Sequence, residues 1–129
     1  MSTIRISIAA ALIVATAALV SAVPAAAKDG RDVRVRGACT QSSAANLKLS
    51  REDGRIEVEF EVDQNRNGVR WNVRLHRNGA LVASTAAVTR APSGSFTVRR
   101  VIGRERAADR ITAVATRTSG ERCSATASF

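Results

Sequence analysis

The chain has 129 residues, a formal net charge of +9, and only one histidine and two cysteines. This composition leaves too few ligands for a structural zinc site, and we expect no cofactor. Arginine outnumbers lysine greatly, which favours an anionic partner; the base composition of a GC-rich genome would also produce this bias.

The N-terminus reads as a leader peptide. Arg5 precedes an apolar run over residues 6–23, and Ala25 and Ala27 form a small-x-small cleavage signal. We expect residues 1–27 to be removed, residues 28–38 to be a loose segment, and residues 39–129 to form one domain. The alternative is an uncleaved anchor, although the run is short and rich in alanine. The residue directly after the cleavage site is Lys28 and not the cysteine that a lipoprotein anchor needs, so the mature chain is expected to be secreted without a stable membrane anchor.

Strands are predicted throughout the remaining sequence. In "RIEVEFEVD" (residues 55–63), apolar residues alternate with three glutamates, which is typical of a strand with one buried face. Similar patterns predict strands over residues 46–50, 69–76, 80–85, 95–101, 110–117 and 122–129. A further strand over residues 32–36 is the alternative to a loose segment there. About seven short strands separated by turn signals indicate an all-β, antiparallel, immunoglobulin-like β-sandwich.

Residues 55–63 and 69–76 are expected to pair as a hairpin. In that register Glu61 lies opposite Arg70 and Glu57 opposite Arg74, while Phe60 faces Trp71 inside. Opposite charges across strands stabilise such a pair modestly. The acidic and basic rows would therefore fix the register without any ligand.

The loop "DQNRNG" (residues 63–68) resembles half of a calcium-binding loop. Asp63, Asn65, Asn67 and Gly68 fall at positions 1, 3, 5 and 6 of the EF-hand pattern. Position 12 is Arg74 where the pattern needs a bidentate glutamate, and the flanks are strands. Asn, Asp and Gly are also the usual residues of tight turns, which is the interpretation we favour over a metal site.

Catalytic groups are sparse. The single histidine, His76, falls at an outward strand position, and the three glutamates of residues 55–63 share one face with arginines expected opposite them. Glycosidase chemistry instead needs one carboxyl group with a raised pKa. We expect no catalytic residues and no enzymatic activity.

The densest basic stretch is "RRVIGRERAADR" (residues 99–110), partly expected to be a loop. Its basic residues are Arg99, Arg100, Arg104, Arg106 and Arg110, offset only by Glu105 and Asp109. Such a stretch suits an anionic envelope polymer or an acidic protein surface. The alternative is an ordinary solvated loop. Because Phe60 and Trp71 point inward and the chain has no tyrosine, we expect no nucleic-acid partner.

Cys39 and Cys123 stand near opposite ends of the predicted domain. In an exported chain such a pair most simply forms one disulfide, which would stabilise the fold by about 4 kcal/mol in the chain-entropy model. The alternatives are two free thiols or an intermolecular bridge.

Three segments resemble small secreted proteins of actinobacterial type. They are "RIEVEFEVDQNRNGVRWNVRLHRNG", "TRAPSGSFTVRR" and "DRITAVATRTSGERC". The resemblance implies an immunoglobulin-like or fibronectin-III-like sandwich and supplies no active-site residues. We therefore expect a binding or adhesion module at the cell envelope; the alternative is a structural protein that pairs through a sheet edge.

Overall fold

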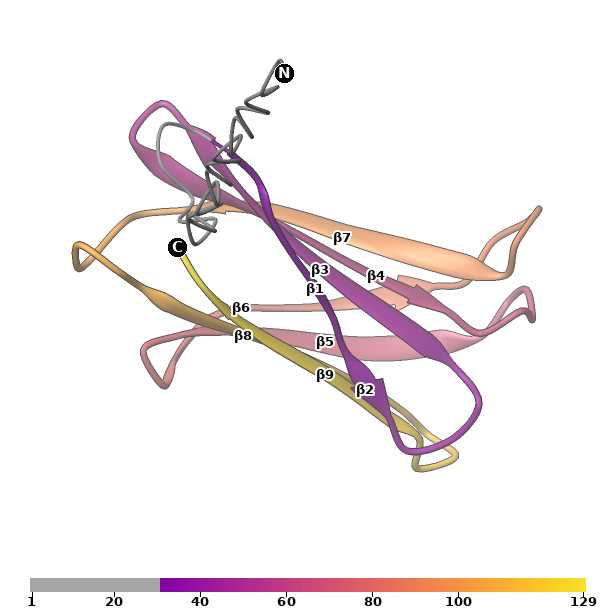
Figure 1. Cartoon of the computed structure of the whole chain (residues 1–129). Coiled ribbons are helices and arrows are strands. Elements are labelled where there is room, and N and C mark those ends of the chain that lie inside the picture. The colour runs from indigo at the N-terminus through magenta and orange to yellow at the C-terminus, as the bar shows by residue number, and fades with distance from the viewer. Residues whose placement is uncertain (1–30) are drawn as a thin grey trace, which may run out of the picture.

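The computed structural model describes residues 31–129, so the expected leader and its cleavage site lie outside the described residues. Nine strands make up the fold (Figure 1). They are β1 (Val33–Arg36), β2 (Ala38–Cys39), β3 (Ala44–Glu52), β4 (Arg55–Asp63), β5 (Arg70–Arg77), β6 (Ala80–Val88), β7 (Ser95–Ile102), β8 (Arg110–Arg117) and β9 (Arg122–Ser128).

The strands form two antiparallel sheets packed face to face (Figure 1). Sheet A has the order β1-β3-β4-β7, and sheet B has the order β2-β9-β8-β5-β6. The predicted antiparallel sandwich is therefore confirmed, with nine strands instead of about seven. The two-residue strand β2 was missed because it is too short to show alternation. β1 lies within residues 28–38 and pairs with β3.

The core lies between the two sheets and follows the alternation seen in the sequence. Ile56, Phe60 and Trp71 are fully buried, and each is flanked by outward polar residues. The rings of Trp71 on β5 and Phe96 on β7 lie 6.1 Å apart between centroids, so this contact joins the two layers. Burying each large apolar side chain stabilises the fold by about 2–3 kcal/mol.

The predicted hairpin between residues 55–63 and 69–76 is wrong. β4 pairs with β3 and β7 in sheet A, whereas β5 pairs with β6 and β8 in sheet B. Residues 64–69 therefore cross from one sheet to the other. Alternation identifies the buried face of a strand. It does not show whether two such strands are neighbours in one sheet or lie in two sheets that pack against each other.

Candidate functional site

The loop over residues 63–68 is tied to the β6–β7 connection. The amides of Gln64 and Gly68 donate to the carbonyl oxygens of Gly94 and Thr89, at 3.0 and 2.7 Å. The buried Thr89 hydroxyl donates to the Arg66 carbonyl at 2.6 Å and accepts from the Val69 amide at 2.9 Å. These contacts give the loop a structural role at one end of the sandwich.

The three residues proposed as metal ligands lie along this loop. Asp63 Oδ1 accepts a hydrogen bond from the Asn65 amide at 3.0 Å, and Asn65 has a φ of 57°. Both features belong to a local Asx-type turn, in which Asp and Asn are favoured. Calcium binding by Asp63, Asn65 and Asn67 stays the less favoured alternative to this turn.

Potential metal ligands gather at one other point in the described part of the chain. The atoms of Cys39, Cys123 and Glu121 lie within 4.8 Å of one another, the sole such group of three His, Cys, Asp or Glu residues within 31–129. The predicted Cys39–Cys123 disulfide is confirmed, and it links β2 to β9. Glu121 accepts hydrogen bonds from Ser43 and pairs with Arg117. All three groups are therefore already engaged.

The five arginines of residues 99–110 are spread over several elements. Arg99 and Arg100 lie on β7 of sheet A, Arg104 and Arg106 lie in the following loop, and Arg110 begins β8 of sheet B. The structure therefore does not gather them into a single patch.

Two of these arginines are held by the protein itself. Arg99 pairs with Glu59. Arg104 donates to the carbonyl oxygens of Ala107 and Phe129 at 2.8 and 3.2 Å, with its guanidinium 5.4 Å from the Phe129 ring centroid. Both side chains thus contribute to packing and loop closure.

Buried Asp109 organises the loop that carries Arg106. Its carboxylate accepts hydrogen bonds from the amides of Glu105 and Arg106 and from the Asn78 side chain, at 2.8–3.0 Å. Burial by itself would raise the pKa of Asp109, but these hydrogen bonds and the charge of Arg77 outweigh it and hold the pKa below its ordinary value. The acidic residues of this segment are therefore structural as well as charge-balancing.

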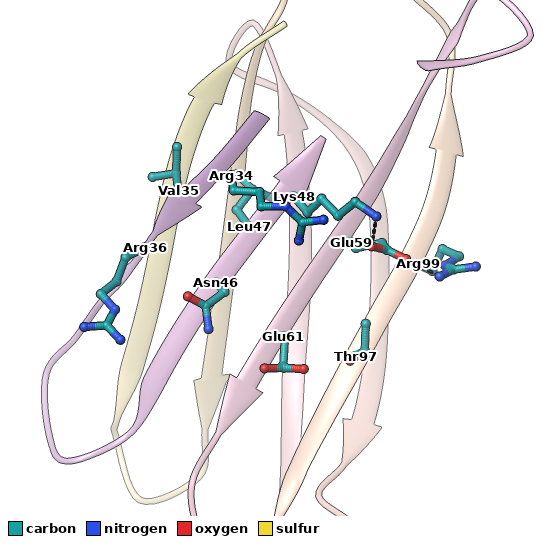
Figure 2. A pocket seen from close by; sticks show the side chains of 10 residues that line it. All are labelled: Arg34, Val35, Arg36, Asn46, Leu47, Lys48, Glu59, Glu61, Thr97 and Arg99. Atoms are coloured by element: carbon teal, nitrogen blue, oxygen red, sulfur yellow. Dashed lines mark hydrogen bonds and ion pairs between the residues drawn. The ribbon is translucent and has the colours of Figure 1, made fainter. Parts of the chain in front are cut away.

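The outer face of sheet A carries charges of both signs around a shallow groove (Figure 2). One row across all four strands contains Arg34, Lys48, Glu59 and Arg99. Lys48 Nζ lies 3.2 Å from Glu59, and this contact, with that of Arg99, lowers the pKa of Glu59 despite partial desolvation. Lys48 and Arg99 thus share an acid of the same face, whereas Arg34 pairs with Asp32 before β1.

The outer face of sheet B has a different charge pattern. None of its five strands contains an aspartate or glutamate, and the acidic residues within strands all belong to β3 and β4 of sheet A. Outward basic side chains lie on β5, β8 and β9: Arg70, Arg74, His76, Arg110 and Arg122. We call these five residues the arginine face.

Serine, threonine and asparagine separate the basic residues of this face. A shallow depression on it is lined by Asn72, Arg74, His76, Ser84, Val114, Thr116 and Arg122. Within residues 31–129, none of the four arginines of the face forms an ion pair. The depression therefore offers hydrogen-bond donors without a competing carboxylate.

The other two arginines of sheet B, Arg77 and Arg117, form ion pairs within the protein. Arg77 bonds the Gly103 carbonyl at 2.7 Å and pairs with Glu105 at 3.2 Å. Arg117 pairs with Glu121 at 3.2 Å and lies 5.7 Å from the Trp71 ring centroid. Both belong to the ends of the sandwich and not to its outer face.

Sequence reasoning missed the arginine face because its members are far apart in the chain. Arg74 and Arg122 meet only because β5 and β9 flank β8 in sheet B. The available signal was the absence of acidic residues from the segments 70–77, 80–88, 110–117 and 122–128. That signal acquires meaning only when these segments are known to share a sheet.

Comparisons with known proteins add no assignment. No protein family, curated protein or solved structure matches the chain at a significant level. Among residues 31–129 there is also no helix with the length and apolar character needed to cross a membrane. The disulfide is typical of proteins in an oxidising, extracellular environment.

Proposed function

We propose that the protein is a secreted, non-catalytic binding or adhesion module that holds an anionic partner at the cell envelope through its arginine face. The observation that carries this proposal is the absence of any acidic residue from the strands of sheet B. Unpaired arginines on a flat surface attract phosphate, sulfate or carboxylate groups and can grip them bidentately. The leader peptide expected from the sequence over residues 1–27 and the disulfide support secretion.

The order of strands supports an immunoglobulin-like relationship in part. β9-β8-β5-β6 follows the G-F-C-C′ order of a variable-type sheet. Sheet A departs from that pattern because β4 follows β3 directly in both sequence and space. The proposed relationship therefore rests mainly on sheet B, which also carries the arginine face.

The test compares two faces at equal charge. Arg74→Gln with Arg122→Gln removes two cations from the arginine face, and Arg34→Gln with Arg36→Gln removes two from sheet A. Each mature variant is immobilised and exposed to envelope and culture fractions at low and high salt. We expect the first variant alone to lose its anionic partner; equal loss from both would show that net charge, and not this face, drives binding.

A single-residue control separates the arginine face from the basic loop. Arg106 is exposed, and its backbone amide, not its side chain, bonds Asp109. Arg106→Gln should therefore leave both the fold and the partner unchanged. Loss of the partner on this change would return the site to residues 99–110.

The second candidate function is pairing through a sheet edge, favoured by β6. This nine-residue edge strand has no charged residue and no proline, and Leu81 and Val88 at its two ends are 55% and 40% exposed. Edge strands usually carry charges or prolines that prevent pairing with other chains. Ala86→Lys would block such pairing, so we expect it to abolish any salt-resistant self-association in sedimentation; persistence of that association would exclude the edge.

A further inference from the structure

The basic residues of the arginine face occupy successive steps along the strands. On β5, Arg70, Arg74 and His76 point outward, and Asn72 takes the remaining outward position. Asn72 on β5 is aligned with Thr116 on β8, and Thr116 is aligned with Arg122 on β9. The row that contains Asn72 therefore has its basic residue, Arg122, on β9.

The series continues beyond the end of β5. The Asn78 amide donates to the Arg110 carbonyl at 2.8 Å, which places Arg110 at the step after His76. Five consecutive rows across sheet B, aligned with residues 70, 72, 74, 76 and 78, thus hold one outward basic side chain each: three on β5, Arg122 on β9 and Arg110 on β8. One step is two residues of a strand, or about 7 Å.

Hydroxyl groups fill the spaces between these basic residues. Thr112, Thr116, Ser124 and Thr126 lie on the outward side of β8 and β9, in the same rows. Aromatic platforms for bases or sugar rings are absent from this face. Phe60, Trp71 and Phe96 are buried, and Phe129 packs beneath Arg104, which completes the aromatic residues of the described chain.

We propose that the arginine face binds a linear polyol chain linked by phosphodiesters, which runs in the direction of β5 over β5, β8 and β9 with one phosphate near the basic residue of each row. This inference rests on the proposed function, which requires only that the face bind anions. The regular spacing favours a polymer with one charge per short repeat, and arginine matches phosphate geometry bidentately. The hydroxyls suit a polyol backbone, and the lack of exposed aromatic rings disfavours single-stranded nucleic acid, which binds by stacking.

The experiment compares three polymers with equal numbers of charges at low salt, using the mature protein and fluorescence anisotropy. The probes are synthetic poly(glycerol phosphate), hyaluronan, whose carboxylates occur once per disaccharide, and oligothymidylate. We expect poly(glycerol phosphate) to bind about tenfold or more tighter than either, equivalent to about 1.4 kcal/mol.

Variants test the spacing, and the two double variants below have the same net charge as the wild type. Arg122→Gln leaves one step without a cation and should weaken binding. Adding Asn72→Arg to it restores a cation at the same step on β5 and should recover most of the affinity. Adding Thr97→Arg instead restores the charge on sheet A and should recover none. Circular dichroism and thermal melts check that each variant is folded.

The outcomes distinguish failure of the proposed spacing of phosphates from failure of the proposed anion-binding function. Equal binding of hyaluronan would overturn the spacing but leave an anion-binding face. Equal recovery by Thr97→Arg would show that net charge drives binding, and would overturn both the spacing and the arginine face. Equal binding of oligothymidylate would overturn the polyol assignment. If none of the polymers binds, and the envelope partner is kept by the Arg74→Gln, Arg122→Gln variant, both proposals are wrong.

Discussion

Glu121 shows how a single buried carboxylate stabilises one end of the sandwich. Its side chain is fully buried, accepts hydrogen bonds from the Ser43 amide and hydroxyl at 3.1 and 2.7 Å, and pairs with Arg117. Burial would raise the pKa of Glu121, but the Ser43 hydrogen bonds and the Arg117 charge outweigh it and lower the pKa. The carboxylate also holds Arg117 against Trp71, which joins the charge to the core.

Replacing Glu121 by Gln should therefore change stability in a pH-dependent way. Because the folded pKa lies below the unfolded value of about 4.3, the stabilisation is present above that pH and is lost as pH falls through the folded pKa. We expect Glu121→Gln to lower the unfolding free energy at pH 7 by about 2–4 kcal/mol, and by less at pH 3.

Urea denaturation at both pH values measures this effect. Glu61→Gln, at an exposed position on β4, is the control and should change neither value. A Glu121→Gln variant that loses stability on acidification as steeply as the wild type would contradict the assigned role.

Gly94 lies so close to the backbone of the 63–68 loop that a larger residue would not fit there. It has a φ of 69°, and a Cβ atom there would lie 2.2 Å from the Arg66 nitrogen. Gly54 has a similar φ of 75° with no atom within 4 Å of its Cβ position. Gly94→Ala should cost well above the roughly 1–2 kcal/mol of left-handed strain expected for Gly54→Ala.

Thermal and urea unfolding of these two alanine variants isolate the steric effect, because the backbone strain is common to both. Equal destabilisation would mean that the 63–68 loop moves away from Gly94 without cost. The loop would then have little structural role, and the metal-site interpretation would gain weight.

At the level of elements, the disulfide makes the two-residue strand β2 part of the sandwich. Cys39 and Cys123 are direct partners in the β2–β9 ladder and lie 84 residues apart in sequence. Replacing both by Ala should lower the unfolding free energy by about 2–4 kcal/mol, since the unfolded chain regains its loop entropy.

Chemical denaturation with and without reductant provides the measurement. The wild-type protein should lose stability in reductant, whereas the double alanine variant should not respond. An equal response of both proteins would mean that reductant acts elsewhere than on this bond.

The strands themselves were largely predictable, and their neighbours were not. The bounds of β4 and β8 follow from local alternation, because inward residues such as Val58 and Ala113 recur at every second position. Pairing depends on contacts distant in sequence. Glu59 pairs with Lys48 on β3 and Arg99 on β7. Arg70 and Arg74, which were expected opposite Glu61 and Glu57, lie in the other sheet.

The candidate site was less predictable for the same reason. The density of arginines in residues 99–110 predicted a basic binding site there. In the structure, however, Arg99 pairs with Glu59 and Arg104 donates hydrogen bonds to backbone carbonyls. Arg70, Arg74 and Arg122 lie in unremarkable segments and become neighbours only through the order of sheet B. Local composition reports charge density along the chain, whereas a binding surface depends on which charges remain unpaired after folding.

At the scale of the whole molecule, the two faces of the sandwich have different electrostatic roles. Sheet A combines arginine and lysine with glutamate, and its Lys48 and Arg99 form ion pairs with Glu59. Sheet B has no acidic residue in its strands. A basic protein with uniformly mixed charges would bind anions weakly over its entire surface, but this separation concentrates the attraction on one side.

The salt dependence of polyanion binding should report that separation directly. Four arginines contacting four anions release counterions, so log Kobs should fall with log salt at a slope of about −3 for a flexible chain. Raising salt from 50 to 200 mM should then weaken binding roughly 50-fold. Arg74→Gln should reduce the magnitude of the slope by about 0.7, whereas Arg36→Gln, which removes the same charge from sheet A, should leave it unchanged. Titrations at several salt concentrations measure both slopes, and equal changes in the two variants would show that the protein binds through its overall charge and not through one face.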